Sequence, residues 1–271
     1  MADTRRTSRL VQGGNVTIET YIDGEGPAFV ILPSYGRDSG ADYDPFVARL
    51  VRAGWKVLRP QPRGIGCSKG PMAGVSLHDL ANDVALCIRR LGHGPAVVLG
   101  HAFGHAVARM TTTDHPDLVK AVVLAAPQSV HVAEDIARTP LIAGDIAAPQ
   151  AERLAALRKA FFAPGHDARL WLEGWYPATL KMQHGAVQSA VLSEFWACGD
   201  VPLLELIGAD DPFRPKQSWD ELRSQFGERV TTVIIQQASH ALLPEQPDAI
   251  ADAVLPWAAR YAALTGSAGT L

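Results

Sequence analysis

Residues 96–109 form the segment of this sequence that bears most directly on chemistry. The run AVVLGHAFGHAVAR reads as a buried strand, a short turn and a helix. Gly100 and Gly104 bracket the turn, and glycine accepts the backbone angles that a very tight strand-to-helix connection requires. Such a turn places its middle residue, Ala102, at the top of the sheet in a strained conformation. An alanine methyl group cannot attack a substrate, so any reaction at this turn needs another group.

This turn resembles the nucleophile elbow of the α/β-hydrolase fold family, which reads G-x-S-x-G with serine at the position of Ala102. Three further segments carry the resemblance. The resemblance assigns the family's acid to Asp211 in the segment LELIGADDPFRP, with Asp210 ranked second. It assigns the catalytic histidine to His240 in the segment QASHALLPEQP. The segment RPQPRGIGCS resembles the family's D-x-R-G-x-G-x-S turn, with Gln61 in place of aspartate, and is interpreted as structural. The order of nucleophile position, acid and histidine is that of the family.

The local sequence supports these two assignments to different degrees. His240 lies in an Ala/Ser loop after a strand rather than on an apolar helical face, which favours a functional role. Asp211 precedes Pro212 and also suits a turn or a helix cap, although its spacing from Gly208 favours the catalytic role. In a triad the aspartate would hold the imidazole in one tautomer.

The loop after the strand at residues 28–32 also departs from the family pattern. The family usually has His-Gly there, whereas this chain has Pro33-Ser34-Tyr35-Gly36. The resemblance implies that the backbone N–H groups of Tyr35 and Phe103 form the oxyanion hole, which needs no particular side chain.

Alanine at the elbow leaves three interpretations open. In the first, Ala102 is an engineered replacement of serine in an otherwise intact site. In the second, the alanine is natural, and His240 and Asp211 activate water or abstract a substrate proton. In the third, the protein has lost its chemistry and only binds a small molecule or partner. Loss of a triad nucleophile costs on the order of a millionfold in kcat, so conventional acyl-enzyme chemistry is not expected. The resemblance implies a hydrolase of a small, largely apolar carboxylic ester or related carbonyl compound.

Other polar residues are expected to have supporting roles. His101 and His105 flank the elbow and are predicted to pack or to support the site. A metal site formed by His101, His105 and His240 is disfavoured, because no carboxylate stands at ligand spacing. Arg37 and Arg63 can hold a substrate carboxylate, but solvated surface arginines are the favoured interpretation. The sequence lacks a dinucleotide fingerprint and a P-loop, so neither a metal nor an organic cofactor is predicted.

The elements that must position these residues alternate between strand and helix. Strands are predicted at 16–22, 28–32, 56–58, 96–99, 121–124, 203–207 and 231–235, with the first at the sheet edge, and helices include 76–91, 103–114 and 247–263. Near-continuous apolar strands are typical of a parallel sheet covered on both faces. The predicted fold class is therefore α/β, as in the α/β-hydrolase fold with a mostly parallel central sheet.

The alternation stops between Pro127 and Asp200, where helical patterns follow one another. We interpret residues 127–200 as an inserted helical cap, and residues 1–126 and 201–271 as the core. The cap is rich in aromatic residues, and large rigid rings suit the wall of an apolar pocket. The predicted pocket residues are Ser34, Trp171, Trp175 and Trp196.

Composition narrows the classes of partner. A chain of 271 residues that is 47% hydrophobic is long enough for one large domain with an insertion, and a net charge of −3 disfavours nucleic acid as a partner. The three cysteines, Cys67, Cys87 and Cys198, are too few and too widely spaced for a disulfide framework. This cysteine usage is typical of a reducing compartment, so a cytoplasmic location is predicted. No apolar run is long enough for a membrane span, so no membrane partner is expected. The expected partner is a small-molecule substrate, and the sequence is compatible with a homo-oligomer.

Overall fold

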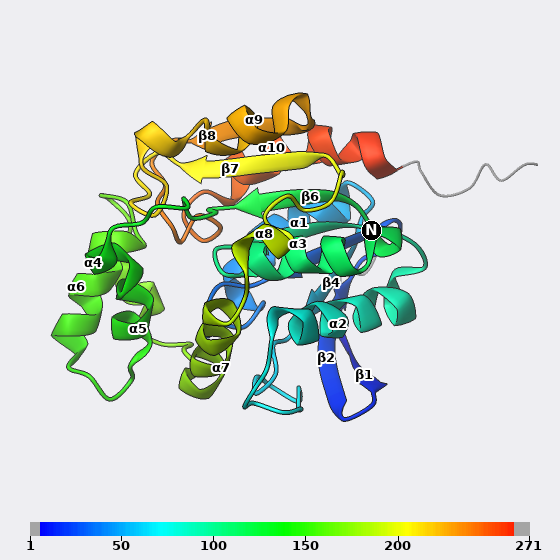
Figure 1. Ribbon diagram of the computed structural model, residues 1–271, viewed down its shortest axis with the longest axis horizontal. Coiled ribbons are helices and arrows are strands. Elements are labelled where there is room, and N and C mark those ends of the chain that lie inside the picture. Colours follow the sequence, from blue (N-terminus) through cyan, green and yellow to red (C-terminus); the bar gives the residue numbers. More distant parts are fainter. Residues whose placement is uncertain (1–5, 263–271) are drawn as a thin grey trace, which may run out of the picture.

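The computed structural model describes residues 6–262, and an eight-stranded sheet forms its centre (Figure 1). The sheet order is β1-β2-β4-β3-β5-β6-β7-β8. β2 pairs antiparallel with β1 and β4, whereas all later neighbours are parallel. The carboxyl ends of the parallel strands therefore meet at one edge of the sheet. The strands are β1 (Thr7–Gly13), β2 (Val16–Asp23), β3 (Ala28–Leu32), β4 (Lys56–Pro60), β5 (Ala96–His101), β6 (Val119–Ala125), β7 (Leu203–Gly208) and β8 (Val230–Ile235).

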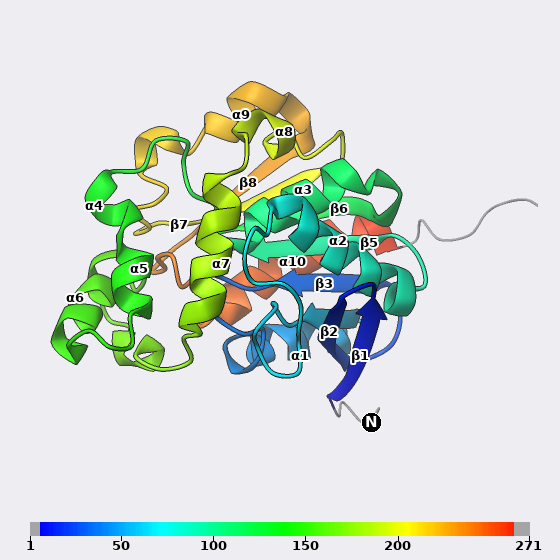
Figure 2. The same ribbon diagram turned by 60° about the horizontal axis from the view of Figure 1, so that its bottom comes forward.

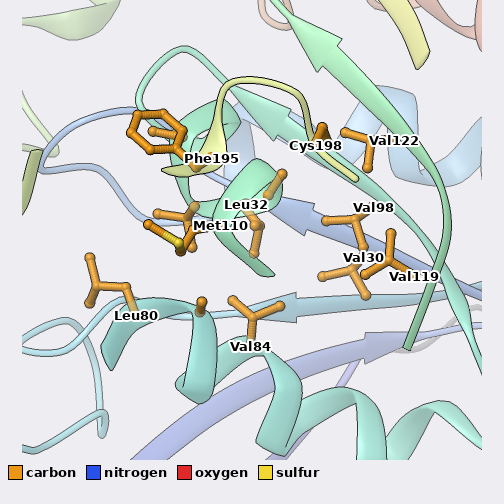
Figure 3. Close-up of a cluster of buried hydrophobic side chains, with 14 of the residues drawn as sticks. Val30, Leu32, Leu80, Val84, Val98, Met110, Val119, Val122, Phe195 and Cys198 are labelled. Carbon is orange, nitrogen blue, oxygen red and sulfur yellow. The ribbon is translucent and has the colours of Figure 1, made fainter. Parts of the chain in front are cut away.

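Helices cover both faces of the sheet, and the central strand β3 is apolar and buried at every position. In β3, Ala28, Val30 and Leu32 pack into one buried cluster, while Phe29 and Ile31 pack into the other. The two-residue period of a strand sends alternate side chains to opposite faces. Figure 3 shows part of the first cluster, with side chains from strands, such as Val30 and Val98, facing side chains from helices, such as Val84. That cluster includes side chains of α2 (Leu77–Cys87), α3 (Gly104–Asp114) and α9 (Glu221–Phe226), and the second includes those of α1 (Asp44–Arg52) and α10 (Pro247–Ala262).

A helical insertion separates β6 from β7. It contains α4 (Glu134–Ala137), α5 (Thr139–Gly144), α6 (Gln150–Ala160), α7 (Pro177–Gln188) and α8 (Leu192–Phe195), and residues 127–200, all of them described, contain no strand. In Figures 1 and 2, α4, α5 and α6 lie beyond the arrowheads of the parallel strands. A third buried cluster joins the insertion to the body, because it also includes Phe213 and Ala241. The predicted α/β class with a helical insertion is confirmed.

The prediction missed elements near the amino terminus. Residues 7–13 form β1, which takes the edge position expected for the strand beginning at Val16. Only Val11 of β1 is buried, so the hydrophobic pattern there is weak. The helix expected to reach Leu91 ends at Cys87, and residues 88–92 continue in a wider turn.

Some sequence predictions extend past the described part of the chain. Residues 1–5 and 263–271 of the predicted core, including the last residue of the helix expected at 247–263, lie outside the described residues. The division of the chain into core and cap at residues 126 and 201 stays a prediction. Cys67 is an exposed free thiol, and Cys87 and Cys198 are buried free thiols. Within residues 6–262, none of the helices has both the length and the apolar character that crossing a bilayer demands.

Candidate active site

The turn between β5 and α3 has the strained backbone that its glycine spacing predicts. Ala102 has a φ of 47°, a left-handed value that is costly for a residue with a side chain. Its N–H donates to the carbonyl of Ala125 on β6 at 2.9 Å, which holds the turn against the neighbouring strand. A Cβ added to Gly100 would collide with the backbone of Gly104, and one added to Gly104 would collide with the carbonyl of Leu32. Both glycines are therefore required by close backbone packing.

His240 and Asp211 meet at the carboxyl edge of the sheet, where the loops after β8 and β7 begin. His240 Nδ1 lies 2.9 Å from Asp211 Oδ2, and both residues are buried. A carboxylate only accepts hydrogen bonds, so Nδ1 carries the hydrogen and Nε2 keeps its lone pair. The other carboxylate oxygen, Oδ1, accepts the N–H of Phe213 at 2.8 Å. Asp210, the second candidate acid, is exposed.

Aromatic rings fix the plane of the His240 imidazole. The Phe213 ring stacks on it with centroids 4.0 Å apart, and Phe161 of the insertion meets it edge-on at 5.6 Å. Glu245 stabilises the loop that carries His240. Its carboxylate accepts hydrogen bonds from the N–H groups of Ser239 and Ala163, each at 2.7 Å. Burial raises the pKa of Glu245, and these two N–H donors oppose that shift. The loop is thus bonded to both the body and the insertion.

A directional chain of hydrogen bonds joins the loop after β3 to the His240 loop. The Ser34 N–H donates to Tyr43 Oη at 3.4 Å, Tyr43 Oη lies 2.9 Å from His101 Nδ1, and His101 Nε2 lies 2.9 Å from the His240 carbonyl. The carbonyl only accepts, so His101 carries its hydrogen on Nε2 and Tyr43 donates to Nδ1. Burial lowers the pKa of His101 to about 3, which keeps the ring neutral. His101 is therefore packed against the His240 loop, and a supporting role in catalysis stays a prediction.

The two predicted oxyanion residues lie side by side. The rings of Tyr35 and Phe103 stack with centroids 4.4 Å apart and an interplanar angle of 26°. The N–H of Gly36, next to Tyr35, donates to Gln183 Oε1 at 2.7 Å. Within residues 6–262, neither the Tyr35 nor the Phe103 N–H donates a hydrogen bond to another group. Their role as oxyanion donors stays a prediction.

A cavity of about 160 Å³, the inner chamber, brings the elbow and the histidine together. The predicted residues on its wall are Ala102, His240, Tyr35 and Phe103. Sequence reasoning assigned His105 to packing or support and did not find the other members. The remaining wall residues are His105, Gln128, Ala137, Pro140, Leu141, Leu180, His184 and Phe213.

The predicted pocket-wall roles of Trp171 and Trp175 are wrong. Both rings are buried in the aromatic cluster of the insertion, with centroids 6.1 Å apart, and neither lines the inner chamber. Ser34 also lies off the chamber wall, with its N–H turned to Tyr43. Large rings stabilise the insertion most when fully buried, which explains their inward position. Trp196 lines a neighbouring cavity instead.

Two buried arginines near the site already have carboxylate partners, so the solvated-surface interpretation is wrong for both. Arg37 Nη2 lies 2.9 Å from Asp42 Oδ2, and its guanidinium lies over the Trp171 ring at 4.2 Å. Arg63 makes a two-point contact with Asp83 at 2.6 and 2.9 Å. Both therefore act as structural cations.

The remaining polar positions fit structural roles. Gln61 bonds to Ser39 through both ends of its side-chain amide, as expected for a structural residue. Within residues 6–262, no group of three or more His, Cys, Asp or Glu side chains is arranged to hold a metal ion.

Comparison with known proteins identifies sequence relatives. A family model for the α/β hydrolase fold matches residues 27–247. The 2-(acetamidomethylene)succinate hydrolase of Mesorhizobium japonicum is 32% identical over 116 residues, which are 43% of this chain and 41% of that protein. The fluoroacetate dehalogenase of a Burkholderia species is 32% identical over 116 residues, 41% of this chain and 38% of that protein. The matches thus span about two fifths of the length of these curated relatives.

Solved structures resemble the chain over nearly its whole length. An esterase from Exiguobacterium antarcticum superposes with a TM-score of 0.76 at 17% identity, covering 93% of this chain and 99% of that one. The E-2-(acetamidomethylene)succinate hydrolase superposes with a TM-score of 0.75 at 20% identity, covering 93% and 98%. These structural likenesses show the fold, and the family model covers most of the sequence. The chain therefore belongs to the α/β-hydrolase fold family.

Proposed function

We propose that this protein is a hydrolase of a small, largely apolar carboxylic ester or related carbonyl compound, in which His240 and Asp211 activate water directly. The observation that carries the proposal is the buried 2.9 Å contact between His240 Nδ1 and Asp211 Oδ2, with His240 and Ala102 on the wall of one chamber. Similarity to hydrolases in the same fold family supports the reaction class. A retained acid–base pair without a side-chain nucleophile suits general base catalysis.

The proposed reaction balances without a covalent intermediate. His240 Nε2 takes a proton from a water molecule while the water oxygen bonds to the substrate carbonyl carbon. The N–H groups of Tyr35 and Phe103 stabilise the resulting oxyanion, and Asp211 stabilises the imidazolium. The intermediate then collapses, the bond to the leaving group breaks, and the proton on Nε2 passes to the departing oxygen. Alanine at position 102 leaves space for water where a serine side chain would lie.

The test compares the natural chain with two variants on short and medium acyl p-nitrophenyl esters. The proposal predicts turnover by the natural chain and a loss of about a thousandfold in His240→Ala, because a positioned base contributes on the order of 10² to 10⁴. Correct folding of each variant is checked by circular dichroism. Turnover that is equal in the natural chain and His240→Ala contradicts the proposal. Turnover found only in Ala102→Ser also contradicts it, and supports a triad that lacks only its serine.

A second candidate is a binding protein that performs no chemistry. The specific observation in its favour is Ala102 at the elbow, since conventional nucleophilic catalysis needs a hydroxyl or thiol there. A small molecule retained by the purified chain and identified by mass spectrometry, with no turnover in either the natural chain or Ala102→Ser, would favour binding over hydrolysis.

A further inference from the structure

A second cavity opens beside the inner chamber. This side chamber has a volume of about 210 Å³ and shares Tyr35, Phe103, His105 and Gln128 with the wall of the inner chamber. The two spaces therefore meet at these four residues. The outer wall of the side chamber is apolar and comes from the end of α7 and from the α8 region: Val187, Ala190, Leu192, Phe195 and Trp196.

The side chamber also reaches the protein surface through apolar side chains. Leu192 is 42% exposed and Val130 is 40% exposed, and both line this chamber. Exposed apolar residues grouped around a cavity mark a surface suited to an apolar ligand. An apolar chain can thus reach the junction of the two chambers from solvent without crossing a polar rim of charged groups.

Neither chamber offers a fixed charge to a ligand. The residues that line the two chambers include no Asp, Glu, Lys or Arg among those the structure describes. A buried cation, Arg109, lies against a wall residue of the side chamber: its guanidinium is 4.3 Å from the centre of the Trp196 ring and donates to the Trp196 carbonyl. Its Nε and Nη2 are buried without hydrogen-bond partners among residues 6–262, but Arg109 does not line the chamber. A carboxylate placed here would lose its hydration and gain no ion pair.

One polar group at the junction is the imidazole of His105, which lies in the first turn of α3. The residue is 6% exposed, and its Nδ1 is enclosed without a hydrogen-bond partner among residues 6–262. Burial lowers the pKa of this imidazole well below its usual value, so the ring is neutral and offers one donor and one acceptor. Because Nδ1 is enclosed while the residue lines both chambers, a ligand at the junction would meet the imidazole through its other polar atom, Nε2.

We propose that the two chambers together bind one uncharged, elongated substrate, with its carbonyl group in the inner chamber, its apolar chain in the side chamber and a hydrogen bond to His105 at the junction. The part of this inference that concerns the reacting carbonyl rests on the proposed function. The part that concerns the side chamber rests on its apolar wall, on the absence of charged residues from that wall and on the position of His105 between the two chambers. The substrate class is thus a neutral acyl compound with a medium-length alkyl chain rather than an anion.

Binding of unreactive analogues tests the inference without turnover. Isothermal titration calorimetry of the natural chain compares butanamide, hexanamide, octanamide and octanoate near neutral pH. We expect affinity to rise about fourfold for each added methylene that enters the side chamber, from the transfer free energy of a buried methylene. Octanoate is expected to bind at least about tenfold more weakly than octanamide, because its charge is desolvated without a partner. Equal or tighter binding of octanoate would overturn the inference.

Two pairs of variants test where the alkyl chain binds and whether His105 takes part in the hydrogen bond. Val187→Phe fills the side chamber and is expected to abolish the dependence on chain length, whereas Gln188→Phe, at an exposed position of the same helix, should leave it unchanged. His105→Phe is expected to weaken octanamide binding about tenfold through loss of one hydrogen bond, and His105→Gln should restore part of it. Identical chain-length dependence in Val187→Phe and Gln188→Phe would also overturn the inference.

The same measurements separate this inference from the proposed function. Octanamide binding that survives unchanged in His240→Ala, with no ester turnover in any variant, would refute the hydrolase and leave the side chamber as a ligand site. His240-dependent turnover that shows no preference for neutral over anionic substrates would support the hydrolase and refute the side-chamber inference.

Discussion

The sheet body and the helical insertion of this protein fix their residues in different ways. In the body, backbone hydrogen bonds hold the strand ends in register, and the loops that follow β5, β7 and β8 therefore bring Ala102, Asp211 and His240 to one edge. In the insertion, position depends on side-chain packing, above all on the buried ring of Trp171. The body sets the reaction geometry, and the insertion shapes the space around it. Substitutions in the body should therefore change the stability of the whole fold. Substitutions in the insertion should mainly change the shape of the two chambers.

Trp171→Ala is expected to have the largest effect on stability in the insertion. The side chain is fully buried among Phe161, Phe162 and Trp175, and truncation of such a ring costs about 4 kcal/mol. Hydrogen exchange followed by mass spectrometry should show faster exchange in α5 and α6 and little change in β5 and β6. Leu170→Ala is the matched control, because Leu170 is 63% exposed. Equal loss of protection in the sheet would contradict the proposed independence of the two regions.

Gly104→Ala tests the corresponding feature of the body. The added methyl group collides with the Leu32 carbonyl, and overpacking against backbone costs about 3 kcal/mol or more of the free energy of unfolding. Gly185→Ala on α7 is the control in the insertion, since its methyl group meets open space and should stabilise the protein by roughly 0.5–1 kcal/mol. Urea denaturation followed by circular dichroism measures both. Equal effects of the two substitutions would show that elbow packing is not the constraint we describe.

Acid should destabilise the body through two histidines that the fold keeps neutral. Burial lowers the pKa of His101 to about 3 and that of His105 well below its usual value, so the unfolded chain binds more protons than the folded chain below about pH 6.5. The stability contributed by each group is therefore fully present above about pH 6.5, and below that pH it falls by about 1.4 kcal/mol for each pH unit of acidification. Urea titrations at a series of pH values should show a slope smaller by that amount in His105→Phe. An unchanged slope would mean that His105 is protonated in the folded protein.

Tyr43→Phe is expected to have the smallest of these effects. It leaves the Ser34 N–H and His101 Nδ1 without partners, at a cost of about 1 kcal/mol. Tyr21→Phe, at a partly exposed position, serves as the control. Nitrogen-15 spectra of the imidazoles report the His101 tautomer directly. Hydrogen on Nδ1 of His101 in the natural chain would contradict the bond directions derived above.

The same contrast explains what could be predicted from the sequence. Apolar strand runs and glycine spacing locate β5 and the elbow. The resemblance to the α/β-hydrolase fold family pointed to Asp211 and His240, and parallel strands bring the loops that carry them to one edge of the sheet. The sequence of the insertion also has helical periodicity. This periodicity shows which face of each helix is apolar, but it does not show which residues that face will contact. Leu180 and His184 therefore went unnoticed, although both come to the inner chamber from α7. The side chamber depends on tertiary packing in the same way.

The central claim is that water attacks the substrate directly, with no acyl group bound to the protein. Rapid-quench mass spectrometry of the intact chain during turnover of p-nitrophenyl butanoate tests this claim. We expect the natural chain to keep its unmodified mass throughout turnover, and Ala102→Ser to gain the mass of one butanoyl group before hydrolysis. His240→Gln should turn over at the background rate. A butanoyl adduct on the natural chain that forms and disappears at the rate of turnover would contradict the account.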